Sequence, residues 1–99
     1  MLVFQAPFDE YEQTDARDRG YVGHASVRTA PDATYKVTFY DTVRLPQDLE
    51  YEIQTGRMCI ADPGLIVLPE VTLENMETAV RHLFEEGYFD DLKSLEKQA

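Results

Sequence analysis

The hydrophobic and polar residues alternate most regularly in the middle of the chain. Over residues 34–45, Tyr35, Val37 and Phe39 alternate with threonine and lysine, which gives one apolar and one polar face. This period of two predicts a half-buried β-strand. Asp41 falls on the apolar face, so we expect a bulge or the end of the strand near this residue.

Further segments have the composition of short strands. The β-branched and aromatic residues of 21–29 predict a second strand, and residues 2–6 predict a third that Pro7 interrupts. The mainly apolar segment 57–68 predicts two short strands around a turn at 61–64, in a central and largely buried position. Together these segments predict a small, mainly antiparallel sheet of three to five strands.

The apolar spacing changes to a helical period in the last third of the chain. Thr72 is a suitable N-cap for a helix, and Gly87 can adopt the left-handed conformation that often ends one. We therefore expect an amphipathic helix over about 73–86, packed on one face of the sheet, with a short helix in the tail after it. Five apolar residues form a stripe roughly 100° wide on this helix: Leu73, Met76, Val80, Leu83 and Phe84.

Two polar segments are less regular. Residues 8–20 are rich in charge without an apolar period, so we expect a surface loop with at most one helical turn. Leu49 and Ile53 are four residues apart, and the glutamate and glutamine around them favour a helix over 46–55. Apolar alternation in the same segment leaves a strand as the alternative. The elements as a whole predict one α+β domain over residues 1–99.

Composition and charge narrow the range of functions. The chain has 9 basic and 19 acidic side chains, which give a net charge of −10. This balance opposes binding to nucleic acid and to anionic membranes, whereas a basic protein partner is electrostatically favourable. The N-terminus lacks the features of a signal peptide, no segment approaches a membrane span, and Cys59 is the only cysteine. We therefore expect a cytoplasmic protein with a reduced thiol.

The sequence contains no recognisable motif for catalysis, a cofactor or a metal. The strand-to-helix corner at 63–72 has no glycine-rich loop and no serine or cysteine on a tight turn, and Glu70 alone lacks an evident structural role there. The spacings of calcium and zinc sites are also missing. Cys59 lies in an apolar segment and is expected to be buried, whereas His82 is expected on the solvent side of the last helix. We therefore expect no cofactor and no metal.

One candidate surface lies at the end of the predicted helix. Glu85 and Glu86 stand where the helix dipole disfavours negative charge, and the acidic groups there surround two aromatic residues. Acidic groups around aromatic side chains suit protein docking. This favours a protein that acts through protein–protein contact, as an inhibitor, an antitoxin-like factor, an adaptor or a complex subunit. The residues of this C-terminal patch are Glu85, Glu86, Tyr88, Phe89, Asp90 and Asp91.

The alternative is a small-molecule-binding protein or an enzyme with a site near His24 and Ser26. Gly20 and Gly23 precede His24 and could let a ligand approach the backbone closely. Histidine and serine are also the residue types of a base and a nucleophile, although the sequence identifies no third group to orient the histidine. An enclosed pocket with His24 in its wall would favour this alternative.

Overall fold

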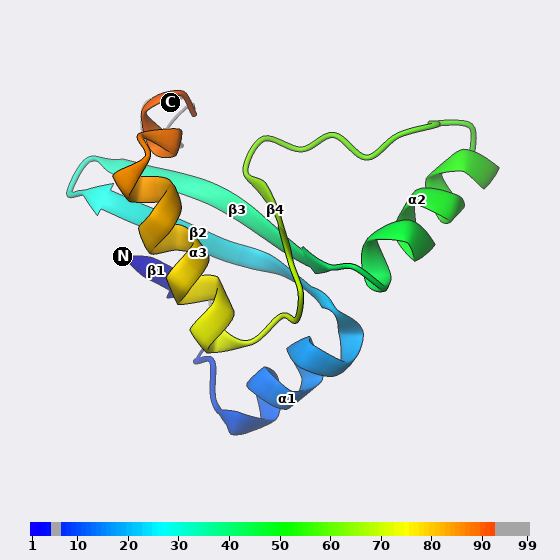
Figure 1. Cartoon of the computed structure of the whole chain (residues 1–99), viewed down its shortest axis with the longest axis horizontal. Helices are drawn as coiled ribbons and strands as arrows, with labels where there is room; N and C mark the ends of the chain where they lie inside the picture. The colour runs from blue at the N-terminus through cyan, green and yellow to red at the C-terminus, as the bar shows by residue number, and fades with distance from the viewer. Residues whose placement is uncertain (5–6, 93–99) are drawn as a thin grey trace.

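The computed structural model describes residues 1–4 and 7–92, in which a four-stranded sheet carries helices on one face and at one end (Figure 1). Since both helices and a mainly antiparallel sheet are present, the α+β prediction is confirmed. In chain order, the elements are β1 (Leu2–Phe4), α1 (Glu10–Arg19), β2 (Tyr21–Ala30), β3 (Ala33–Asp41), α2 (Arg44–Gln54), β4 (Leu65–Leu68), α3 (Leu73–Glu85) and the 3-10 helix η1 (Tyr88–Asp90).

The strands lie in the sheet in their chain order, β1-β2-β3-β4. The pairs β1–β2 and β2–β3 are antiparallel, whereas β4 is parallel to β3. A parallel neighbour requires a crossover connection, which α2 and the loop after it supply. The strand predicted over 34–45 ends at Asp41, as the position of this residue on the apolar face suggested, and the residues from Arg44 onward are helical.

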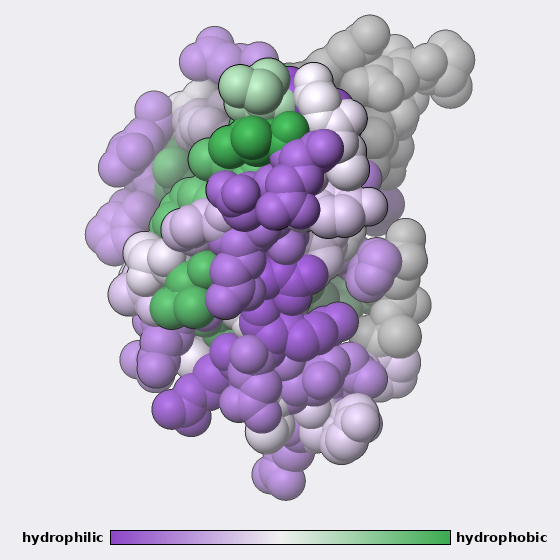
Figure 2. Space-filling view, turned by 90° about the vertical axis from the view of Figure 1, so that its right-hand side faces the viewer, coloured by the Kyte–Doolittle hydropathy of each residue, from purple (hydrophilic) through white to green (hydrophobic). Residues whose placement is uncertain are grey.

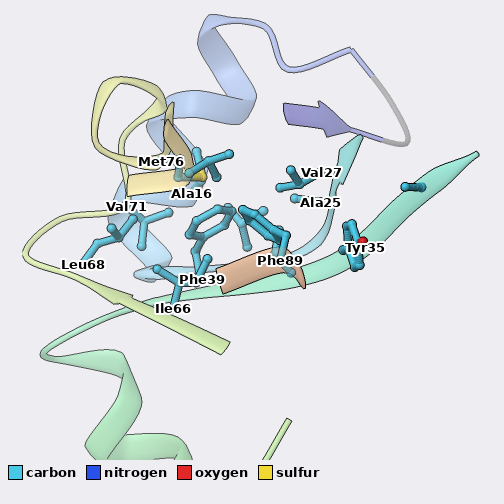
Figure 3. Close-up of a cluster of buried hydrophobic side chains, with 14 residues drawn as sticks. Ala16, Ala25, Val27, Tyr35, Phe39, Ile66, Leu68, Val71, Met76 and Phe89 are labelled. Carbon is cyan, nitrogen blue, oxygen red and sulfur yellow. The ribbon is translucent and has the colours of Figure 1, made fainter. Parts of the chain in front are cut away.

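The hydrophobic core lies between the sheet and the helices α1 and α3 (Figure 3). Val37 and Phe39 of β3 are fully buried, and Met76 and Val80 of α3 are 0% and 2% exposed. Phe89 of η1 is buried in the same cluster. The apolar face predicted for β3 is thus the face that the helices cover, and its burial is the main favourable contribution to folding.

Helix α1 corrects the expectation of a surface loop over 8–20. The carboxylate of Asp9 accepts a hydrogen bond from the backbone N–H of Glu12 at 2.9 Å, so it caps the first turn. At the other end Gly20, with a φ of +70°, donates its N–H to the carbonyl of Ala16. Ala16 is the only buried residue of the helix. The sequence therefore lacks an apolar stripe because capping and charge, rather than burial, define this helix.

Helix α3 confirms the predicted C-terminal helix and its N-cap. The Thr72 hydroxyl accepts a hydrogen bond from the backbone N–H of Asn75 at 3.1 Å. Gly87 adopts the left-handed conformation after the helix, with a φ of +80°. His82 is exposed, as expected from its position opposite the apolar stripe.

The apolar stripe of α3 is only partly buried. Met76 and Val80 lie in the core, and Leu73 and Leu83 are half-buried. The prediction is wrong for Phe84, whose side chain is 44% exposed. Phe84 lies at the edge of the stripe in the last turn, where Phe89 returns to the core after the helix.

The prediction for residues 57–68 is wrong in two respects. Only the second of the two expected strands is present in the described part of the chain, as β4, and it lies at the edge of the sheet. Ile66 and Leu68 point into the core, but Val67 is 46% exposed. Residues 57–63 form a loop outside the core, and Cys59 is exposed rather than buried. The helix expected over 46–55 is confirmed as α2.

We expect Met76→Ala to lower the free energy of unfolding by about 2–5 kcal/mol, because it leaves a cavity in the core. Phe84→Ala removes a larger but exposed side chain and should cost about 1 kcal/mol or less. Chemical denaturation of the two variants checks the difference. Equal losses would contradict the described position of α3 on the sheet.

The N-cap of α3 can be tested at Thr72. Thr72→Ala should lower the free energy of unfolding by about 0.5–2 kcal/mol because the N–H of Asn75 loses its acceptor. Thr72→Asn should be nearly neutral, since asparagine is also a good N-cap. Thermal unfolding of both variants provides the measurement, and equal destabilisation would show that Thr72 contributes through packing rather than capping.

Candidate functional site

The C-terminal patch is only partly available at the surface. Its four carboxylates are exposed, and Tyr88 is half-buried. Phe89 is only 3% exposed and packs against the ring of Tyr35, with ring centroids 5.6 Å apart. Phe89 must therefore be removed from the predicted docking surface, because its side chain is part of the core. The remaining patch has negative charge but no fully exposed aromatic side chain, and its role in docking stays a prediction.

His24 and Ser26 do not form a common site among the described residues. His24 is exposed in the wall of an open hollow of about 170 Å³, between β2 and the stacked rings of Phe4 and Phe8. Ser26 does not line this hollow; it pairs with Val3 and Lys36 in the neighbouring strands. The hollow is smaller than the roughly 300–1,000 Å³ of most small-molecule pockets. The enclosed pocket that would favour an enzyme is thus not formed by this part of the structure.

Helix α2 differs from the other long helices because it lies beyond the end of the sheet, away from α3 (Figure 1). Leu45, Leu49 and Ile53 recur every four residues and form an apolar stripe along it. None of its residues is fully buried: Leu45 and Leu49 are half-buried, and Ile53 is 39% exposed. Figure 2, viewed from the side on which α2 lies, shows apolar side chains along one flank of a mostly polar surface. The described residues therefore cover the apolar side of this amphipathic helix only in part.

The start of α2 is held by Asp41 at the end of β3. One oxygen of this carboxylate accepts hydrogen bonds from the backbone N–H groups of Val43 and Arg44, at 2.9 and 2.6 Å. These bonds satisfy two amides that the helix itself leaves without acceptors. Gly20 contacts the same carboxylate, and a Cβ at this position would overlap it. The turn from α1 to β2 therefore leaves just enough space for the group that caps α2.

A polar cluster ties the first turns of α2 to the sheet. Arg44 donates from Nε to Asp48 at 2.7 Å, and the Tyr40 hydroxyl donates to the other carboxylate oxygen at 2.9 Å. The Arg44 guanidinium also lies over the ring of Tyr21, 5.5 Å from its centroid. Burial, together with the hydrogen bond to Asp48, raises the pKa of Tyr40 well above its usual range. The hydroxyl, a donor at physiological pH as in any tyrosine, therefore also remains a donor in more alkaline solution.

A polar cleft of about 330 Å³ separates α2 from the loop that follows it. Asp48 and Glu52 line its helix side, and each forms an ion pair with an arginine: Asp48 with Arg44, and Glu52 with Arg57 at 3.6 Å. Cys59 lines the loop side. Among residues 1–4 and 7–92, no group of three or more histidine, cysteine or carboxylate side chains is placed to hold a metal ion. Tyr40, Arg44 and Asp48 also line this cleft, so its lining includes the cluster that ties α2 to the sheet.

Comparisons of the chain with protein-family models, with curated proteins and with solved structures found no match. No helix within the described ranges has the length and apolar character needed to cross a membrane. The function must therefore be inferred from the surfaces themselves. The sequence analysis noted Leu49 and Ile53 but not that they are incompletely covered, because periodicity identifies an apolar side of a helix without showing what covers it.

We expect Asp41→Ala to loosen α2 without unfolding the core. Two backbone amides lose a charged acceptor, so the amides of α2 should exchange with deuterium about tenfold faster, whereas those of α3 should keep their protection. Hydrogen exchange followed by NMR provides the residue-level measurement. Asp18→Ala, which removes the same charge from an exposed position in α1, is the matched control. Unchanged protection of α2 in Asp41→Ala would show that the cap does not stabilise the helix.

Proposed function

We propose that the protein acts through protein–protein contact rather than catalysis, as an inhibitor, an antitoxin-like factor, an adaptor or a complex subunit. The amphipathic helix α2, which has no buried residue, is the observation that carries this proposal. Large apolar side chains in and beside the helix add to its exposed surface: Val43, Tyr51 and Met58 are 66%, 63% and 67% exposed. Exposed apolar surface favours association, because a partner that covers it removes it from water.

The charge of the protein favours a basic partner. The net charge is −10, and α2 contributes three acidic residues against one arginine. Opposite charge on the partner would accelerate the encounter and select among competing surfaces. The carboxylates of the C-terminal patch would add to this attraction at long range. Nucleic acid and anionic membranes would be repelled by the same charge.

The proposal includes the cytoplasmic location that the sequence suggests. A reduced Cys59 is compatible with that compartment. The exposed thiol has no disulfide partner in the chain, since it is the only cysteine. Its location in the loop beside α2 also provides a labelling position close to the proposed docking region.

Affinity capture from native lysate, combined with native mass spectrometry of the purified chain, tests this function. We expect a protein of net positive charge to be retained in near-stoichiometric amount and to be released when the salt concentration is raised. We also expect the purified chain to carry no small molecule. The matched variant is His24→Ala, which should retain the partner because the His24 hollow is not involved. A co-purified metabolite that His24→Ala loses would contradict the proposal and favour the small-molecule alternative.

A further inference from the structure

We infer that α2 is a docking helix, which binds in an apolar groove with a basic rim on a partner protein. This inference rests on the proposed function, and it assigns the docking contact to one element of the fold. The floor of the groove would receive the apolar stripe of α2, and its rim would meet the exposed carboxylate of Glu50 beyond one edge of that stripe. The stripe consists of Leu45, Leu49 and Ile53.

The spacing of the stripe suits recognition of a helix by a groove. Residues four apart in an α-helix are displaced by about 40° around its axis, so the three side chains of the stripe lie within about 80° of one another. Helices that bind in grooves use such anchors, one turn apart, on a single side. With 11 residues, α2 is about 16 Å long, which is enough to present three successive anchors.

The way α2 is attached leaves the stripe partly available to a partner. Asp41 and the Tyr40–Asp48–Arg44 cluster hold the first turns of the helix, and they use its polar side. Within the stripe, Leu45 and Leu49 are half-buried, and Ile53 is 39% exposed. Because the helix is already formed and its first turns are held in place, binding would cost little conformational entropy.

The charges beside the stripe specify the chemistry of the groove. On a helical projection Glu52 lies beside one edge of the stripe and Glu50 beyond the other, whereas Arg44 lies about 100° or more from each stripe residue. Arg44 is also held by Asp48 and Tyr21. Glu52 is paired with the exposed Arg57 at 3.6 Å, whereas Glu50 is exposed to solvent. A groove rim with a lysine or arginine side chain would be complementary to Glu50.

A second copy of the chain is a less suitable partner for α2. Each copy has a net charge of −10 and the same exposed Glu50 on α2, so self-association through the stripe would bring like charges together. Strand addition is also disfavoured, because the edge strands β1 and β4 have only three and four residues. A different protein with a basic, apolar groove fits both the stripe and the charge.

The inference can be tested on the full chain with a defined probe. The probe is a synthetic 14-residue amphipathic helical peptide of leucine and lysine, which presents an apolar face bordered by ammonium groups. We expect NMR shift changes to concentrate at residues 44–58, and a peptide with glutamate in place of lysine to bind at least about tenfold more weakly. Sedimentation of the chain alone should show a monomer at about 100 μM, a concentration at which a weak dimer would be detected.

Matched variants separate the stripe from other apolar surface. Leu49→Gln with Ile53→Gln should weaken binding of the leucine–lysine peptide at least about tenfold, because both anchors lose their apolar contact. Phe84→Gln, which changes an exposed apolar residue of α3, should leave the Kd within about twofold. Circular dichroism and chemical denaturation should show an intact fold in both cases, since neither variant changes a buried residue.

Several outcomes would overturn the inference. Shift changes centred on 85–91 or on the His24 hollow, no binding of the peptide, or unchanged affinity of the α2 double variant would each remove α2 as the docking helix. A dimer that the double variant abolishes would assign the stripe to a second copy. If the peptide tests exclude α2 and native lysate still yields a basic partner, the proposed function stands, and another surface of the protein is the docking site. If a metabolite co-purifies instead, the proposed function fails as well.

Discussion

The burial of the apolar face of β3 is the contact on which the rest of the structure depends. Phe39 and Val37 of this strand meet Met76 of α3 in the core, and β3 also pairs with β2 on one side and β4 on the other. Its last residue, Asp41, then caps α2. A single strand therefore sets the position of the core helix, the order of the sheet and the direction in which α2 leaves it.

The contrast between α2 and α3 is the structural basis of the proposed function. Both helices are amphipathic, but α3 packs on the sheet with Met76 and Val80 buried, whereas α2 has no buried residue. Covering α2 with a partner would remove apolar surface from water without changing the core. The acidic residues beside its stripe would then determine which partners associate, since charge complementarity contributes more to specificity than to total affinity.

The C-terminal patch and the surface near His24, both suggested by the sequence, differ from α2 in the side chains that they expose. The C-terminal patch retains its carboxylates, but Phe89 is inside the core and Tyr88 is half-buried, so little aromatic surface is left for a partner. At the other candidate surface, His24 lines an open hollow that Ser26 does not enter. Charge without apolar area gives weak, salt-sensitive contact.

The sequence by itself determined the elements whose signals are local. Alternation defined β3 up to Asp41, helical spacing and the Thr72 cap defined α3, and four-residue spacing favoured α2. Helix α1 was not predicted, because its signals are a capping aspartate and a terminal glycine without an apolar stripe. Tertiary structure alone decided that Phe89 is buried, that Cys59 is exposed and that the stripe of α2 is only partly covered. Burial depends on which distant segments pack together, and periodicity along the chain contains no information about those partners.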